Sequence, residues 1–258
     1  MPVVVTLALC SLVPCSCKSS KPEKILDLGK GVTMKLAVIR AGTFTMGSPE
    51  DEADRRTDEG PPHAVTISKP FCMGMYEVTQ EQYEAVTGRN PSTFKGKQNP
   101  VENVSWDDAV EFCKKLSQKT GKTVRLPTEA QWEYACRAGS KTAFSYGDDA
   151  DYRNLGDYAW NAGNSGGSPH PVGGKKPNAW GLYDMHGNVW EWCADWYAES
   201  YVNPGALDPQ GPGAGTGRVL RGGGWIYHAP RCRSAHRDWG APDLRDSSDG
   251  FRVITDSD

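Results

Sequence analysis

The side chains that most readily do chemistry in this sequence are its cysteines. Three of the eight lie within the first twenty residues, and five are spread through the rest of the chain. Those five are Cys72, Cys113, Cys136, Cys193 and Cys232. None of them shows the Cys-x-x-Cys spacing of a zinc cage, and an odd number does not define a complete disulfide framework. The pattern therefore predicts neither a zinc site nor a set of disulfide pairs.

The histidines offer little metal chemistry. His228 and His236 are eight residues apart, but no third ligand is spaced to join them, so we expect no catalytic metal there. His63 follows an acidic, proline-containing stretch over residues 49–62 and has no partner ligand nearby in the sequence. We expect His63 to hydrogen-bond the backbone.

A domain rich in loops must position these side chains. The chain has 258 residues, of which 38% are hydrophobic, and it contains 29 Gly, 18 Pro and 9 Trp. Glycine and proline favour turns, and large rings pin an irregular backbone. The formal net charge of −3 argues against nucleic acid as a partner. Alternating apolar residues predict strands over residues 32–39 and 42–48.

Three capping boxes predict three helices. Their sequences begin at Thr79, Ser105 and Thr128, and each has Gln or Asp three residues later. Apolar residues follow at helical spacing. No internal repeat or linker interrupts the sequence, so we expect one domain over residues 31–258.

The N-terminal residues have the composition of a targeting signal. Residues 3–13 form an apolar run too short to span a bilayer, and a Cys-Ser-Cys sequence with polar residues follows. This resembles a bacterial lipoprotein signal. We therefore predict a signal peptide over residues 1–17, lipidation at Cys17 (with Cys15 as the alternative) and a tether over residues 18–30. A cleaved secretory peptide without lipid is the other interpretation, and both place the domain outside the cytoplasm. With the lipid we expect an outer-surface lipoprotein on the extracellular face of a bacterial membrane.

Several long motifs follow one another in order. They are Arg125–Ala135, Gly181–Trp192, Arg221–Trp225 and Gly250–Val253, extended by Met46–Ser48, Tyr76–Thr79 and Pro100–Trp106. With these motifs the chain closely resembles the formylglycine-generating-enzyme (sulfatase-modifying-factor) family over nearly its whole length. The resemblance implies an α+β, C-type-lectin-like fold with little regular secondary structure.

The resemblance also carries an expectation about catalysis. Active members of the family use two cysteines, five residues apart, to bind copper and oxidise a substrate cysteine. Here Tyr227 stands at the first position and Cys232 at the second. A lone thiol cannot form a two-sulfur soft-metal site. We therefore expect no copper and no enzymatic activity, the alternative being a formylglycine-generating oxidase that acts on a sulfatase cysteine.

A structural calcium ion is a second expectation from the family. The matching ligands are the side chains of Asp184 and Glu191 and the backbone carbonyls of Gly187 and Val189. Hard oxygen ligands on an irregular loop suit Ca²⁺. The alternative is a loop held by its own hydrogen bonds.

The segment over residues 224–249 has an unusual composition. It contains no Lys, Glu, Gln or Met, and most of its residues can be reached by changing the adenines of an Asn codon, although Trp239 cannot. This resembles the variable segment of diversity-generating-retroelement target proteins, such as the variable surface lipoproteins of Treponema. The resemblance implies a variable ligand-binding segment displayed on a lectin-like fold.

We therefore predict a monomeric surface protein that binds a protein or another host or cell-surface ligand, and that contacts the membrane only through its lipid. Large rings and arginines suit such contacts. The alternative is a generic non-catalytic family domain with solvated polar loops. The candidate contact residues are Ile226, Tyr227, His228, Arg231, His236, Asp238, Trp239, Gly240, Asp243, Leu244, Asp246, Ser247 and Ser248.

Overall fold

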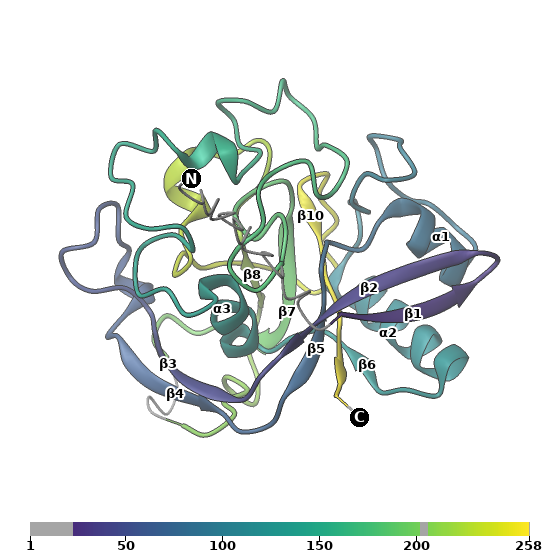
Figure 1. Cartoon of the computed structure of the whole chain (residues 1–258), viewed down its shortest axis with the longest axis horizontal. Helices are drawn as coiled ribbons and strands as arrows, with labels where there is room; N and C mark the ends of the chain where they lie inside the picture. The colour runs from purple at the N-terminus through teal and green to yellow at the C-terminus, as the bar shows by residue number, and fades with distance from the viewer. Residues whose placement is uncertain (1–22, 202–205, 258) are drawn as a thin grey trace, which may run out of the picture.

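The computed structural model describes residues 23–201 and 206–257 (Figure 1). Within these residues three small sheets and three α-helices are joined by long loops. The longest helix has 15 residues and the longest strand has 8. The protein is therefore α+β with little regular secondary structure, as the sequence predicted.

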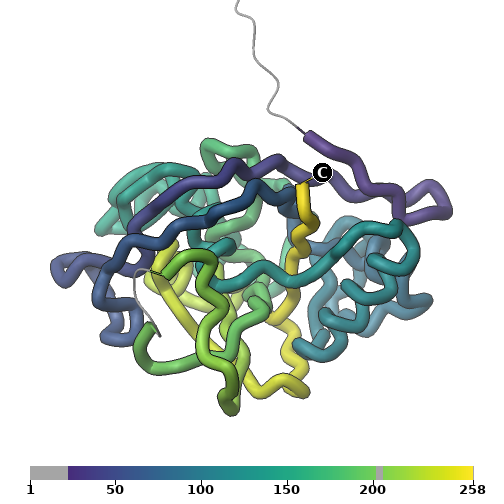
Figure 2. The backbone as a smooth tube through the Cα atoms, turned by 90° about the horizontal axis from the view of Figure 1, so that it is seen from below, coloured from purple at the N-terminus to yellow at the C-terminus, as the bar shows by residue number. Residues whose placement is uncertain are grey.

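One sheet joins the two ends of the described chain. Its strand order is β1-β2-β5-β11-β6, and every neighbouring pair is antiparallel. In Figure 2 the yellow C-terminal strand ends beside the purple N-terminal strands. The strands are β1 (Glu23–Gly29), β2 (Val32–Ile39), β5 (Phe71–Gly74), β11 (Ile254–Asp256) and β6 (Val124–Arg125).

The predicted tether over residues 18–30 is wrong for residues 23–29, which form β1. Leu26 and Leu28 of this strand are buried, and its backbone pairs with β2. Two buried leucines two positions apart give the strand one apolar face, so it packs as part of the core. Lys30, the last residue of the predicted tether, lies in the turn between β1 and β2. Residues 18–22 and the predicted signal peptide, with Cys15 and Cys17, lie outside the described residues.

The other two sheets are a four-stranded sheet, which includes part of segment 224–249, and a two-stranded hairpin. A four-stranded sheet has the order β10-β7-β8-β9, with β10 parallel to β7 and the other pairs antiparallel. Its strands are β7 (Trp190–Trp196), β8 (Arg218–Arg221), β9 (Asp238–Gly240) and β10 (Asp249–Gly250). A hairpin supplies the last pair, β3 (Gly42–Met46) and β4 (His63–Ile67).

The three predicted capping boxes are confirmed. The side chains of Thr79, Ser105 and Thr128 each accept a hydrogen bond from the backbone N–H three residues on, and each box is reciprocal. These bonds satisfy amide groups that have no partner inside the helix. The helices are α1 (Gln80–Thr87), α2 (Trp106–Thr120) and α3 (Glu129–Arg137).

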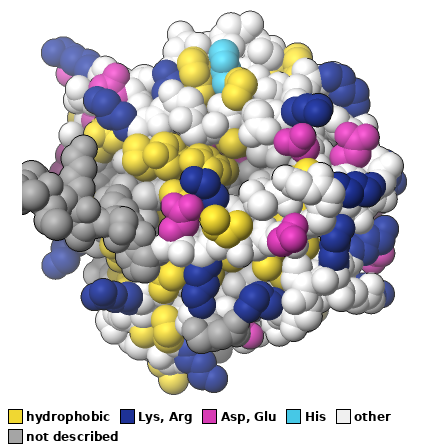
Figure 3. Space-filling view, turned by 45° about the vertical axis from the view of Figure 1, so that its right-hand side comes forward, with side chains coloured by type: hydrophobic (Ala, Val, Ile, Leu, Met, Phe, Trp, Pro, Cys, Tyr) yellow, Lys and Arg dark blue, Asp and Glu magenta, His cyan; other side chains and the backbone are white. Residues whose placement is uncertain are grey.

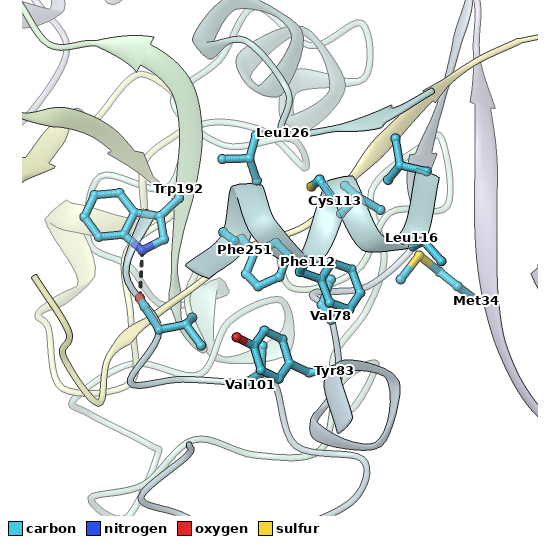
Figure 4. Close-up of a cluster of buried hydrophobic side chains, with 14 of the residues drawn as sticks. Met34, Val78, Tyr83, Val101, Phe112, Cys113, Leu116, Leu126, Trp192 and Phe251 are labelled. Atoms are coloured by element: carbon cyan, nitrogen blue, oxygen red, sulfur yellow. Dashed lines mark hydrogen bonds between the residues drawn. The ribbon is translucent and has the colours of Figure 1, made fainter. Parts of the chain in front are cut away.

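A core of aromatic and aliphatic side chains lies under α1 and α2 (Figure 4). The ring of Phe112 stacks on Tyr83 with centroids 5.5 Å apart, and both rings meet the edge of Phe251. The Trp192 Nε1 donates to Val104 O at 3.0 Å, which ties β7 to the loop before α2. This core fixes β7 as a base for the loops that follow it.

The surface is mixed in character. On the face in Figure 3, positive and negative side chains are interspersed around a group of hydrophobic ones. Among the described residues, no helix combines the length and the apolar character needed to cross a membrane.

Candidate functional site

The candidate site is the segment 224–249, which leaves β8 and returns to the sheet twice. It passes a 3-10 turn over Ala229–Cys232, pairs with β8 as β9, and ends as β10 beside β7. Gly222 and Gly223 precede it with φ of 99° and 80°, a left-handed backbone that favours glycine. The segment is therefore held at its start, middle and end.

Trp225, near the start of the segment, is hydrogen-bonded to a residue near its end. Its Nε1 donates to Ser247 O at 3.0 Å, and its backbone N–H donates to Asn188 O at 2.7 Å. The ring is buried and meets the edge of Phe94 with centroids 5.2 Å apart. Trp225 is thus an anchor, as the sequence indicated.

Two buried arginines anchor the middle of the segment. The Arg233 guanidinium donates to Glu59 at 2.6 and 2.7 Å and to Glu52 at 2.6 Å. The Arg237 guanidinium donates to both oxygens of Glu129 at 2.6 and 2.9 Å. Such bidentate pairs are strong and directional. Sequence reasoning missed both anchors because each carboxylate lies more than 100 positions away along the chain.

A third arginine holds the backbone between these anchors. Arg221, at the end of β8, forms an ion pair with Glu133 inside the protein. Its guanidinium also donates at 2.9 Å to the backbone carbonyls of residues 234, 235 and 236. These bonds satisfy carbonyls that no strand ladder reaches. The path of the segment is therefore fixed by Arg221, the first residue of the motif Arg221–Trp225.

Three of the predicted contact residues are buried, so the prediction is wrong for them. His236 lies beneath the surface, with its Nδ1 3.4 Å from Glu59 Oε1, and burial lowers its pKa. Gly240 is a strand residue where any side chain would meet the Trp192 ring. Ser248 donates its N–H and Oγ–H to Asp246 at 2.8 and 2.7 Å. All three are therefore interior residues of the segment and not contact residues.

Ten predicted contact residues are exposed or half-buried. Ile226, Trp239 and Leu244 are large apolar side chains that are 53%, 48% and 46% exposed. The Trp239 ring stacks on Tyr197 at 5.9 Å, which holds the ring in place. The others are Tyr227, His228, Arg231, Asp238, Asp243, Asp246 and Ser247.

Three of these residues form a local group. Arg231 donates to Asp238 at 2.8 Å, and its guanidinium carbon lies 5.1 Å from the centre of the Tyr227 ring. Tyr227 in turn packs edge-on against Trp190 of β7 with centroids 5.5 Å apart. The Tyr227 ring is therefore a packing element of the surface.

The five cysteines of the described residues show no reactive pair. All five are buried, and none of them forms a disulfide. Burial raises the pKa of the Cys232 thiol to about 12, and that of Cys136 to about 12, so both stay protonated near neutral pH. His63, away from this segment, has its Nδ1 2.9 Å from Pro61 O, which confirms the expected backbone hydrogen bond.

Of the residues expected to bind calcium, Asp184, Gly187 and Val189 lie in the loop before β7 and Glu191 lies in β7 itself, and they fit an ion in part. Asp184 is buried, with its Oδ2 accepting from the Gly173 N–H at 2.7 Å and its Oδ1 without a hydrogen-bond partner. Glu191 accepts from Arg252 through both oxygens, at 2.6 and 2.7 Å, and from Trp132 Nε1 at 2.8 Å. Since a carboxylate has about four lone-pair positions, Glu191 keeps room for a metal.

Gly187 and Val189 complete the expected set with backbone carbonyls. The Gly187 N–H donates to Gly222 O at 2.7 Å and the Val189 N–H to Glu77 Oε1 at 3.0 Å, so the loop also has its own hydrogen bonds. Among the described residues, no three Asp, Glu, His or Cys side chains gather as a metal cage. A metal here would depend on the backbone oxygens.

Glu77 adds a further buried carboxylate beside this loop. Burial raises its pKa, and the nearby negative charges of Asp184 and Glu191 raise it further. The one opposing cation that these groups share is Arg252. The sequence reasoning missed Glu77, although it lies within the family motif Tyr76–Thr79.

The fold and these motifs define a domain of known type. A model of the sulfatase-modifying factor enzyme 1-like domain matches residues 29–257, so the chain belongs to this family. The formylglycine-generating enzyme of Mus musculus is 30% identical over 287 residues, covering 86% of this chain and 75% of the mouse protein. The family predicted from the sequence motifs is confirmed.

Two solved structures are similar over almost the whole chain. Treponema denticola variable protein 1 is 34% identical with a TM-score of 0.82, covering 91% of this chain and 99% of that one. PvdO from Pseudomonas aeruginosa is 34% identical with a TM-score of 0.83, covering 93% and 100%. The predicted fold of the formylglycine-generating-enzyme type, and the likeness to a Treponema variable protein, are both confirmed.

Proposed function

We propose that this chain is a non-enzymatic binding protein whose segment 224–249 is the contact surface for a protein or another cell-surface molecule. Within the described residues six large hydrophobic side chains are exposed, and three of them, Ile226, Trp239 and Leu244, lie in this segment of the chain. Exposed apolar side chains rimmed by polar ones are typical of protein-binding surfaces. That concentration is the observation that carries the proposal.

The segment also suits diversification by a retroelement. Its buried anchors, Trp225, Arg233 and Arg237, alternate with side chains on which the fold does not depend. The similarity to Treponema denticola variable protein 1 supports this part of the proposal. Sequencing the 3′ end of the gene across many cells tests it. A near-identical template copy with differences confined to template adenines is expected, and an invariant end without a template would contradict it.

A display experiment tests the contact surface directly. Codons 226, 239 and 244 are randomised in one library, and codons 25, 110 and 207 in a matched control library, because the latter are the other exposed apolar residues. Both are selected against one immobilised model protein. We expect folded binders from the first library at a rate at least tenfold above the second. Equal enrichment, or loss of folding in most members of the first library, would contradict the proposal.

The competing function is the oxidase chemistry of the family. The mouse relative is a formylglycine-generating enzyme, and Cys232 is present here. Its burial and raised pKa weigh against it as a copper ligand or nucleophile. Incubation with Cu(I), oxygen and a sulfatase peptide containing cysteine is expected to leave the peptide mass unchanged. Conversion of the cysteine to formylglycine would establish the enzymatic function instead.

A calcium ion would bind through Asp184, Glu191 and the carbonyls of Gly187 and Val189, and would hold that loop. The unpartnered Asp184 Oδ1 and the surplus of buried carboxylates support this proposal. Bound ions stabilise the folded state by mass action. We expect calcium to raise the melting temperature of chelator-treated protein and to have no such effect on Asp184→Ala. A calorimetric titration with calcium that gives no heat would contradict this proposal.

The remaining parts of the proposal concern location and assembly. We propose a monomer tethered by lipid at Cys17 to the outer face of a bacterial membrane, with no nucleic-acid partner. The Cys-Ser-Cys sequence after the apolar run supports the lipid. Mass spectrometry of the mature N-terminus is expected to find acylated Cys17, and Cys17→Ser to release the protein from the cell. Acylation at Cys15 would assign the lipid anchor to Cys15 instead, and an unmodified N-terminus would contradict the lipid anchor.

A further inference from the structure

One cavity lies outside segment 224–249 and has no role in the functions proposed above. Its volume is about 590 Å³, within the usual range for small-ligand pockets. It lies between the residues before β5, the outer ends of β6 and β11, the first turn of α3 and the start of β8. Its ionisable lining side chains are Lys69, Arg125, Asp208, Arg218 and Asp256.

Arg218 is held between two tryptophans at this cavity. Its guanidinium carbon lies 3.7 Å from the centre of the Trp106 ring and 3.4 Å from that of Trp196. Two rings at such distances occupy opposite faces of the planar group, so only its edge is left for hydrogen bonds. On that edge Nη1 donates to Ala194 O at 2.7 Å, whereas the buried Nε has no partner.

The arginines at this cavity differ from those of the buried anchors. Arg221, Arg233 and Arg237 each face a carboxylate within 4.0 Å. Among the described residues, Arg125 and Arg218 form no such pair. Arg125 donates to Gln131 Oε1 at 2.9 Å, and Asp208 is taken by the N–H of Ser68 at 2.8 Å. The cavity therefore presents two arginines that have no carboxylate within 4.0 Å, although the carboxylates of Asp208 and Asp256 also line it.

We propose that this cavity binds a ligand through a carboxylate group, with the stacked edge of Arg218 as its recognition element. A guanidinium fixed on both faces loses little freedom when its edge donates to a planar carboxylate. An acceptor on that edge would also remove the cost of leaving a buried donor unpaired. Lys69 and Arg125 add attraction from the rim.

The charge of the lining favours a monoanion. Three cations stand against the two carboxylates Asp208 and Asp256, which leaves one net positive charge. A carboxylate neutralises that charge, whereas a phosphate with two charges overshoots it. The carboxylate has two sources that fit this volume, a free small acid and an acidic side chain of a peptide, and they share this recognition chemistry.

Calorimetric titration at low salt tests the site with defined probes. The probes are butyrate, an acetylated and amidated tetrapeptide with one glutamate among glycines, its counterpart with glutamine in that position, and sulfate. We expect butyrate or the glutamate peptide to bind and the glutamine peptide to give no heat. Binding by the peptide alone assigns the site to acidic peptide segments, and binding by butyrate alone assigns it to free acids. No heat from either acid, or sulfate binding as tightly as the acid, would overturn the proposal.

Variants assign the binding to Arg218. Arg218→Gln and Arg218→Lys are each expected to weaken binding at least tenfold, because neither offers the planar edge. Arg153→Gln is the matched control, an exposed arginine that lies outside the cavity lining. Equal loss in the control, or full affinity in Arg218→Lys, would overturn the role of the edge. Should the Arg218 variants not fold, the exposed Lys69→Ala is expected to weaken binding instead.

Failure of this site and failure of the contact surface are separable. The titration depends on residues at the β8 and β6 edge, and the display libraries depend on residues 226, 239 and 244. A protein with one property can lack the other.

Discussion

Arg231 and Arg233 lie two positions apart and have opposite roles. The Arg231 side chain is 39% exposed and pairs with Asp238 at the surface, whereas the Arg233 side chain is 1% exposed and pairs with Glu52 and Glu59. An exposed ion pair contributes little, because water and salt screen it. A buried pair that loses one member leaves an uncompensated charge inside the protein. The same residue type therefore makes an exposed contact at one position and a buried anchor at the other.

This contrast makes a prediction for the stability of the segment. Arg233→Met is expected to lower the free energy of unfolding by about 3–5 kcal/mol, because Glu59 remains buried without its partner. Arg231→Met is expected to change it by less than about 1 kcal/mol. Urea denaturation of both variants measures the difference. Similar values for the two would show that Arg233 is not an anchor.

The sequence allowed some of these roles to be predicted and concealed others. The exposed Ile226, Trp239 and Leu244 were identified because they lie in segment 224–249, which its composition and its resemblance to variable segments marked as a contact surface. Arg233 and Arg237 have nothing local to mark them, since Glu59 and Glu129 are brought to them by the fold alone. His236 was misassigned for the same reason, because its burial depends on that distant loop.

Among the secondary-structure elements, those held by hydrogen bonds between residues close in the sequence could be predicted from local sequence signals. A capping box is complete within four residues, so the start of each helix could be predicted from the sequence. The strands β6 and β10 have two residues each and exist only through their partners. β1 was missed because it follows a polar stretch, and its role depends on the pairing with β2.

A pair of substitutions in β1 tests whether residues 23–29 are a core strand or a tether. Leu28→Ala is expected to lower the free energy of unfolding by about 2–5 kcal/mol, because it leaves a cavity in the core. Ile25→Ala, on the exposed side of the same strand, is expected to stay within about 0.5 kcal/mol of the unmodified protein. Thermal or urea unfolding measures both. No loss with Leu28→Ala would mean that these residues are a tether after all.

The molecule as a whole is held together without disulfides in its described part. Its long loops are tied instead by buried ion pairs, tryptophan hydrogen bonds and packed rings. Burial also protects the thiols, because a buried thiol with a raised pKa is a poor nucleophile. This arrangement differs from the disulfide frameworks that small secreted domains often use.

Thiol labelling followed by peptide mass mapping checks this picture. In the native protein we expect Cys72, Cys113, Cys136, Cys193 and Cys232 to react at less than about a hundredth of the rate of a free thiol, and all five to react in denaturant. Reducing agent is expected to leave the melting temperature unchanged. A pair of these cysteines that stays unlabelled in denaturant until it is reduced would reveal a disulfide.

The long reach of the arginine anchors limits how this domain can be engineered. A designer who moves residues 224–249 into another scaffold also moves Arg233 and Arg237 into its interior, but leaves Glu52, Glu59 and Glu129 behind. A working transplant must therefore carry a loop and a helix end from the first half of the gene. Exchanging single exposed side chains in place avoids that requirement, and this makes the intact domain the natural unit for building new binders.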